Sequence, residues 1–229
     1  MKYKEGNHQR MNPDKLLRTY TAAQLESIAR DQIQNLKKQG LFSIPVDIEL
    51  IVERLHKIQI DVQRGLKESH NIWGMIGHRK DSDKFIILVD ENLFDLDSLR
   101  LVYRMTVAEE FAHGLLHGEA ILAVETNDDF LKLQRHPDWH KHDRNAKRLA
   151  AAVLMPPEDI LNDARNYYKE LVQIAGFGDA EAVKKYLVKR LAEEYDVSQT
   201  SMEFRLNEWP IKVFDKIDQS IKDRLDFLD

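Results

Sequence analysis

The stretch from Ser98 to Gly118 constrains the fold of this chain more than any other. Apolar side chains recur there at spacings of three and four residues, the period of an α-helix with one face against a core. Asp97 or Ser98 could cap the start of this helix, and Gly118 is a typical residue for its end. The apolar stripe consists of Leu101, Val102, Met105, Ala108, Ala112, Leu115 and Leu116.

Charged side chains lie on the edge of this stripe, within the segment VAEEFAHGLLH at residues 107–117. Glu109 and His113 are one helical turn apart, so their side chains share a face. A carboxylate pushed toward an apolar interior costs several kcal/mol unless it is paired with a charge or binds a cation. Two interpretations follow: Glu109 is accommodated without a metal, in a partly exposed Glu–Glu pair or by an arginine such as Arg104, or Glu109 and His113 share a metal ion. In the second, Glu110 lies beside the metal without binding it and can take a proton from a bound water.

The remaining sequence predicts helices, a short sheet and then mostly helices. Residues 1–20 are polar and aperiodic, and we expect a loosely ordered lead-in. A capping box at Thr21 predicts a helix to about Lys38, and a second helix begins near Ile44. From about residue 139 onward the pattern is helical. Strand-like segments occupy residues 58–62, 72–77 and 85–89. This order indicates an α+β fold.

The composition limits the chemistry and the partners of the chain. Its 229 residues contain no cysteine, so any metal must be held by nitrogen and oxygen ligands, and a cysteine nucleophile is excluded. The formal net charge of −5 argues against a general nucleic-acid surface, which needs a basic field. The N-terminal residues lack the apolar core of a signal peptide, and no apolar run reaches membrane length. We therefore expect a cytoplasmic protein without a membrane or nucleic-acid partner.

Two segments resemble the ImmA/IrrE family of metallo-endopeptidases. Members show a helix of the form R-F-T-L-A-H-E-L-G-H-x-L-L-H and later a helix of the form E-x-x-A-N-x-F-A-A-x-L-L-M-P. The matching segments read RMTVAEEFAHGLLH at residues 104–117 and DRNAKRLAAAVLMP at residues 143–156. Residues 44–62 are similar to the family's first helix and strand, and residues 191–209 to its closing helical pair. The resemblance implies a zincin-like α+β fold, a metallopeptidase core with a short sheet and a mostly helical C-terminal half, with residues 21–229 as one peptidase-like domain.

The resemblance also implies a metal site, with two departures from the family motif. Glu109 stands where the family has its first zinc histidine, and Asp143 stands where it has a glutamate ligand. The implied ligands are Glu109, His113 and Asp143 around a divalent cation, with Glu110 as the general base for a metal-bound water. One nitrogen and two oxygens form a harder ligand set, so zinc remains the first expectation while manganese and iron become more competitive. Such a site requires the Asp143 carboxyl to lie within about 5 Å of the other two ligands.

Further histidines lie near these positions. His142 adjoins Asp143 and is the alternative third ligand. His136 and His140 are expected to be solvated loop residues. His117 lies one turn beyond the histidine ligand, and family members often carry a histidine there that does not bind zinc.

The resemblance implies an intracellular peptidase that cleaves a regulatory protein, a repressor or an antitoxin, frequently encoded with a mobile element. In peptidases of this architecture an edge strand pairs with an extended peptide, and residues 84–93 could be that strand or a buried central one. The alternative function is a catalytically impaired module that holds a protein in the same groove. The change at position 109 favours this alternative.

The C-terminal part raises a second alternative, a DNA-binding regulator. Residues 191–209 resemble a helix-turn-helix, in which a turn lets two helices cross tightly. Glu193, Glu194 and Asp196 make a poor phosphate-binding surface, so a structural role is favoured. The final segment, VFDKIDQSIKDRLDFLD, is amphipathic and could pack on the body or mediate self-association. The oligomeric state stays open.

Overall fold

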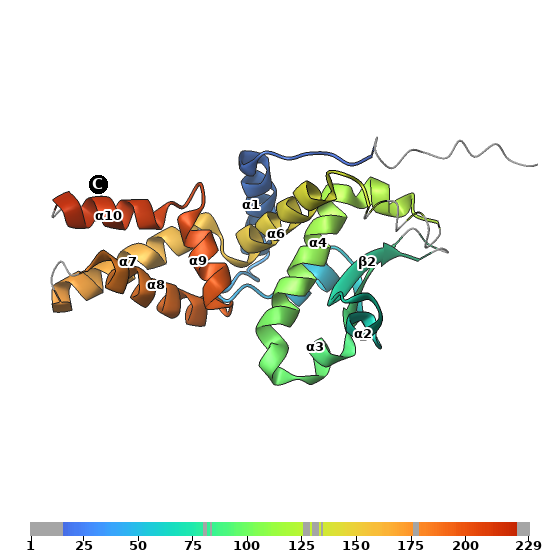
Figure 1. Cartoon of the computed structure of the whole chain (residues 1–229), viewed down its shortest axis with the longest axis horizontal. Helices are drawn as coiled ribbons and strands as arrows, with labels where there is room; N and C mark the ends of the chain where they lie inside the picture. Colours follow the sequence, from blue (N-terminus) through green and yellow to red (C-terminus); the bar gives the residue numbers. More distant parts are fainter. Residues whose placement is uncertain are drawn as a thin grey trace, which may run out of the picture.

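A three-stranded mixed sheet, a long helix packed on it and a group of further helices make up the architecture (Figure 1). The computed structural model describes residues 16–79, 82, 84–125, 129, 133, 135–175 and 179–223. The expected lead-in at residues 1–15 lies outside the described residues. The α+β fold class, with a short sheet and a helical C-terminal half, is confirmed.

The elements follow the order that the sequence pattern predicts. In chain order they are α1 (Ala22–Lys38), the π-helical segment η2 (Leu50–Leu55), β1 (Gln59–Gln63), α2 (Leu66–His70), β2 (Gly74–His78), β3 (Phe85–Asp90), α3 (Glu91–Asp95), the 3-10 segment η3 (Asp97–Leu99), α4 (Arg100–Leu122), α6 (Trp139–Leu154), α7 (Pro157–Ala175), α8 (Ala180–Tyr195), α9 (Gln199–Asn207) and α10 (Val213–Asp223). The predicted capping box at the start of α1 is present, since Thr21 and Gln24 each hydrogen-bond the backbone N–H of the other.

β3 is the central strand of the sheet. It pairs in parallel with β1 and antiparallel with β2, so the strand order is β1-β3-β2. Ile87 and Val89 on one face of β3 are fully buried and Ile86 and Leu88 on the other face are partly buried, which explains the continuous apolar run in this segment. The interpretation of residues 84–93 as an edge strand is therefore wrong, and the buried alternative is confirmed. β2 forms the edge of the sheet that packs beside α4.

Both expected ends of α4 are wrong. Asp97 and Ser98 lie in η3, and no side chain caps the helix. At the other end the helix continues past Gly118, with one non-helical residue at His117. A Cβ atom at position 118 would lie 3.1 Å from the Phe85 ring, so this glycine serves the helix–sheet contact instead of ending the helix.

α4 packs against the sheet on one side and α6 on the other (Figure 1), so its buried surface is broader than one stripe. Val102, part of the predicted stripe, is 37% exposed. The buried residues of α4 are Thr106, Val107, Ala108, Phe111, Ala112, His113, Leu116, His117, Ala120 and Ile121. A helix with partners on two sides cannot keep its polar side chains to one solvent face.

Two glycines allow α4 and β2 to approach closely. A Cβ atom at Gly74 would lie 2.6 Å from Cγ2 of Thr106, and one at Gly114 would lie 2.7 Å from Cδ1 of Ile76. Both distances are too short for a side chain without local movement. The small residues therefore set the distance between the edge strand and the helix that carries the motif.

The segment before α1 is held along α4. The Tyr20 hydroxyl donates to the Leu116 carbonyl at 3.0 Å, and Arg18 pairs with Glu119 at 3.1 Å. The expected loose lead-in therefore has defined contacts at its last described residues. Among the described residues, every helix is too short or too polar to cross a lipid bilayer.

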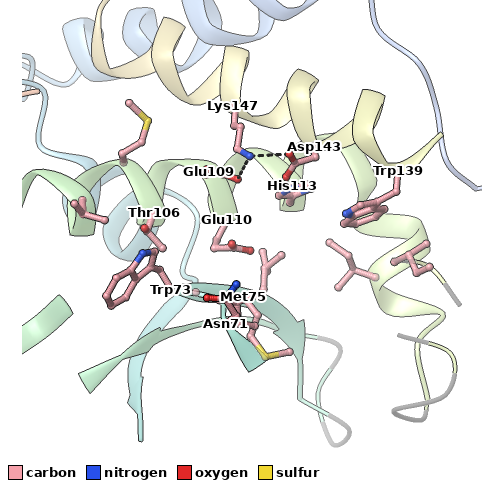
Figure 2. A pocket seen from close by; sticks show the side chains of 17 residues that line it. Asn71, Trp73, Met75, Thr106, Glu109, Glu110, His113, Trp139, Asp143 and Lys147 are labelled. Atoms are coloured by element: carbon pink, nitrogen blue, oxygen red, sulfur yellow. Dashed lines mark hydrogen bonds and ion pairs between the residues drawn. The ribbon is translucent and has the colours of Figure 1, made fainter. Parts of the chain in front are cut away.

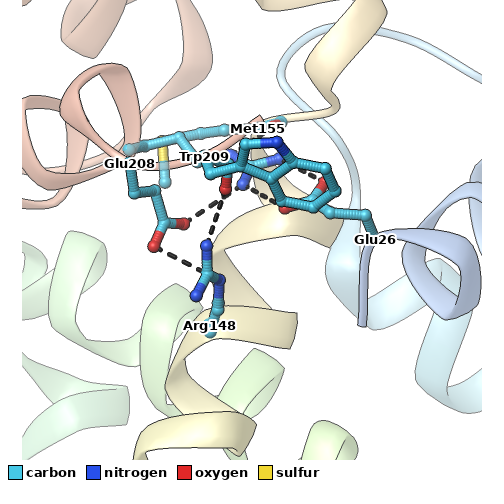
Figure 3. A network of polar contacts seen from close by, with 6 residues as sticks. Glu26, Arg148, Met155, Glu208 and Trp209 are labelled. Carbon is cyan, nitrogen blue, oxygen red and sulfur yellow. Dashed lines mark hydrogen bonds and ion pairs between the residues drawn. The ribbon is translucent and has the colours of Figure 1, made fainter. Parts of the chain in front are cut away.

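A buried ion pair joins the N-terminal helix to the C-terminal helices (Figure 3). Arg205 of α9 donates to both carboxylate oxygens of Glu26 on α1, at 2.6 and 2.9 Å, and both side chains are almost completely buried. The same guanidinium donates to the Met155 carbonyl at 3.1 Å and to Glu208 at 3.2 Å. Arg148 of α6 also pairs with Glu208, so three segments distant in sequence share one network.

The helix-turn-helix resemblance gains no support from this packing. α8 and α9 are joined by a short turn at residues 196–198, but Arg205 is the one basic residue of α9 and it is 1% exposed. α9, described along its whole length, therefore presents no basic side chain to a phosphate backbone. The geometry favours the structural role that the sequence indicates for residues 191–209.

Candidate metal centre

A pocket of about 480 Å³ lies between β2, α4 and α6 (Figure 2). The segment before β2 and the first half of that strand form one wall, and α4 and α6 form the other. The residues that line it are Asn71, Ile72, Trp73, Gly74, Met75, Ile76, Val102, Met105, Thr106, Glu109, Glu110, His113, Ile121, Leu133, Trp139, Asp143 and Lys147. Every residue of the metal site expected from the sequence is among them, apart from the alternative ligand His142.

Three potential metal-binding side chains meet in this pocket. Glu109 and His113 extend from consecutive turns of α4, and Asp143 extends from the first half of α6. One ligand atom from each lies within 4.8 Å of the others. His113 Nε2 and Asp143 Oδ1 are 3.9 Å apart, a span that two metal bonds of about 2.0–2.2 Å can bridge. The donor set therefore fits a divalent cation after small side-chain shifts, and the expected distance of about 5 Å is met.

Glu110 follows Glu109 in the chain, and its side chain points toward β2 (Figure 2). Its Cγ atom would lie 3.3 Å from a Cβ atom at Gly74, which places the carboxyl against the edge strand. Burial raises the pKa of Glu110 from 4.5 to about 7. A carboxyl with a pKa near neutrality can both accept and return a proton, which is the property a general base requires.

Lys147 is a member of the site that the sequence interpretation missed. Its ammonium lies 2.7 Å from Asp143 Oδ2 and 3.7 Å from Glu109 Oε1 (Figure 2). The family motif quoted above has asparagine at this position, so the change to lysine was visible in the sequence as a further departure from the motif. The expected alternative, an Arg104–Glu109 pair, is wrong because Arg104 bonds the backbone of Val46 and pairs with Asp196.

The surroundings shift the pKa values of Glu109 and Asp143 in opposite directions. Burial raises the pKa of Glu109, and the Lys147 ammonium opposes this rise. The His113 ring, together with Lys147, lowers the pKa of Asp143 to about 2. At neutral pH Asp143 is thus a permanent anion.

Trp139 fixes the orientation of the imidazole. Its ring stacks on His113 with centroids 5.5 Å apart and planes only 5° from parallel. Trp139, Asp143 and Lys147 are four residues apart in turn, so one face of α6 supplies all three to the pocket. The tryptophan was not expected as a site residue, because nothing in its local sequence indicates that it meets α4.

The other histidines form a cluster beside the site, in which the His117 ring lies 5.6 Å from the His113 ring. His142 is 2% exposed, and its ring packs 5.0 Å from His117 and 6.0 Å from His136. His142 was the alternative third ligand. Among the described residues, the group of side chains that could hold a metal ion consists of Glu109, His113 and Asp143, without His142. Burial lowers the pKa of His117 to about 3, so this ring is neutral. The expectation of a solvated side chain fits His140, which is exposed, but not the partly buried His136.

A comparison with protein-family models agrees with this geometry. Residues 77–207 match the Peptidase_M78 family, described as the IrrE N-terminal-like domain. The matched range covers more than half of the chain and contains both helices of the site. No curated protein matches the chain. The resemblance to ImmA/IrrE proteins is thus confirmed, and the chain belongs to the Peptidase_M78 family of metal-dependent peptidases.

Proposed function

We propose that this protein is an endopeptidase in which Glu109, His113 and Asp143 hold a divalent cation and Glu110 is the general base. The observation that carries the proposal is the approach of the three donor atoms to within 4.8 Å of one another, with Glu110 in the same pocket. Zinc is the first candidate. Manganese and iron are also plausible because two of the three donors are carboxylate oxygens.

The chemistry divides between the cation and the protein. A divalent cation at this position would polarise the scissile carbonyl and acidify a coordinated water. Glu110 takes the proton of the attacking water and returns it to the leaving amine. Its raised pKa suits both transfers. Trp139 keeps the His113 ring in one orientation while this happens, since the two rings are stacked.

We propose that the substrate is an extended peptide that adds to the edge of the sheet at β2. Residues 71–76 line the pocket, and β2 is the edge strand beside α4. Backbone hydrogen bonds to an edge strand hold a peptide without regard to most of its side chains. In this proposal the scissile bond lies alongside β2, in the pocket that also holds Glu110 and the proposed cation ligands.

The proposals for the substrate protein and for the cellular location rest on the resemblance to the family. We propose that the substrate is a regulatory protein, a repressor or an antitoxin, and that cleavage occurs in the cytoplasm. We further propose that residues 21–229 act as one peptidase-like domain. The Glu26–Arg205 pair, which links α1 to α9, supports this extent.

One observation favours a second candidate function, a non-catalytic module that holds a protein in the same pocket. Lys147 already supplies a positive charge to Glu109 and Asp143. A site neutralised in this way can bind a peptide without hydrolysing it.

The substitution Glu110→Gln separates the two candidates. The purified protein, supplied with zinc or manganese, would be assayed on a mixture of quenched fluorescent peptides. We expect wild-type cleavage that a chelator abolishes, and a loss of about 10²- to 10⁴-fold in Glu110→Gln with metal binding retained. Glu119→Gln is the matched control, because this exposed glutamate lies on the same helix and pairs with Arg18. A metal-loaded wild type that cleaves no peptide, yet binds some of them, would support the binding module.

A further inference from the structure

Lys147 occupies the position from which a cation would neutralise the two carboxylates of the site. Its Nζ atom lies 2.7 Å from Asp143 and 3.7 Å from Glu109, on the side of Asp143 away from the 3.9 Å contact with His113 (Figure 2). The lysine therefore neutralises Oδ2 of Asp143 and Oε1 of Glu109, while Oδ1 of Asp143 faces the His113 ring. The lysine comes from the same face of α6 as Asp143, one turn later.

The ammonium and a dication cannot share these carboxylates at no cost. Like charges a few ångströms apart repel strongly in a partly buried site, where water screens them poorly. The side chains of Glu109 and Asp143 are 20% and 33% exposed, so neither is fully screened. Without Lys147, the same two carboxylates would face each other with no cation between them. The lysine thus stabilises the metal-free site and opposes the metal-bound one.

Lys147 is also free to leave. Its side chain is 56% exposed, although its ammonium contacts the pocket. A lysine has a long flexible stem and a strongly hydrated head group, so withdrawal into solvent breaks two ion pairs without exposing core surface. The two arrangements, lysine inside or lysine outside, differ by side-chain rotation alone.

We propose that Lys147 is a tethered cation that competes with the metal for Glu109 and Asp143, so that metal loading is an exchange in which the lysine withdraws. The proposal rests on the ligand set of the proposed function. It assigns to Lys147 the regulation of metal occupancy. The metal-free site stays ordered, and loading requires a higher free metal concentration than the three ligands alone would need.

The test is isothermal titration of the full chain with zinc chloride and with manganese chloride. Lys147→Met removes the competing charge and keeps most of the stem, and we expect it to bind metal at least about tenfold more tightly than the wild type. Lys147→Arg keeps the charge and should stay near the wild-type affinity. Lys141→Met is the matched control, because it removes the same charge from an exposed position on α6 that pairs with Asp138. Lys147→Gln repeats the test with a polar replacement.

A second readout follows from the same reasoning. Metal-free Lys147→Met should melt at a lower temperature than the wild type, and saturating metal should raise its melting temperature by more. Equal or weaker metal binding by Lys147→Met would overturn the exchange while leaving the ligand set intact. Absence of metal binding in every variant would overturn the metal site of the proposed function, and the exchange with it.

Discussion

His113 Nε2 lies 3.9 Å from Asp143 Oδ1, although the two residues belong to different helices. The packing of α4 on α6 brings the imidazole and the carboxylate together, and Trp139 holds the ring in place. The candidate site is therefore a property of tertiary packing as much as of the motif on α4. Changes that move α4 relative to its neighbours should alter both stability and activity.

Glu110 predicts a pH-dependent stability of the metal-free protein. Burial raises its pKa from 4.5 to about 7. Because the folded-state pKa is the higher one, the stability that this group contributes is complete below about pH 4.5 and is lost as the pH rises through about 7. A shift of this size corresponds to roughly 3 kcal/mol at most. The melting temperature of metal-free Glu110→Gln, relative to the wild type, should therefore be higher at about pH 8 than at about pH 5.

Glu119→Gln is the control for this pH dependence. It makes the same substitution at an exposed position of α4, where the carboxylate pairs with Arg18. Its melting temperature relative to the wild type should change little between the two pH values. A Glu110→Gln difference that is the same at both pH values would show that Glu110 is not held in an environment that favours its neutral form.

Gly74→Ala should disturb both packing and catalysis. The added methyl group would lie 2.6 Å from Thr106 Cγ2 and 3.3 Å from Glu110 Cγ. We expect a loss of about 1–3 kcal/mol in the free energy of unfolding, measured in urea, because overpacking forces neighbouring atoms to move. Peptidase activity should fall as well, since the general base is one of those neighbours.

Gly77→Ala is the matched control in the same strand. A Cβ atom there has no heavy atom within 4 Å among the neighbours that the structure describes. Its free energy of unfolding should stay within about 0.5 kcal/mol of the wild type. Equal losses in the two variants would contradict the close approach of β2 to α4.

The Glu26–Arg205 pair predicts a large loss of stability when one partner is removed. Glu26→Ala removes the buried carboxylate that binds the Arg205 guanidinium through both oxygens and leaves it only the partly exposed Glu208 and the Met155 carbonyl, so we expect about 3 kcal/mol of destabilisation in urea unfolding. Glu158→Ala breaks an exposed pair with Arg30, at 3.6 Å, and should cost less than about 1 kcal/mol. A small effect of Glu26→Ala would mean that α1 and α9 are not joined through this network.

The features that the sequence alone predicted are those with a local signal. The apolar period of α4, the capping box at Thr21 and the two family motifs each lie within one helix or its boundary. The proximity of Glu109, His113 and Asp143 followed from the motifs, because their relative order in the chain matches that of the family. Fold class and family could therefore be predicted before any coordinates.

The features that the sequence did not predict depend on contacts between elements. The strand order could not be derived, because the apolar run of β3 suits either a central strand or an edge covered by a helix. Gly118 has the signal of a helix end, yet it serves the contact with Phe85. Trp139 and Lys147 became site residues only through the packing of α6 on α4. The sequence shows a lysine where the family motif has asparagine, but only the structure shows that this lysine pairs with Glu109.

X-ray diffraction from crystals soaked in zinc chloride, with data collected at the zinc absorption edge, tests the shared cation most directly. We predict an anomalous peak within about 2.5 Å of a carboxylate oxygen of Glu109, of His113 Nε2 and of a carboxylate oxygen of Asp143, with the Lys147 ammonium displaced from between the carboxylates. A peak bound instead by His142, or no peak in contact with Glu109 and Asp143, would contradict the account.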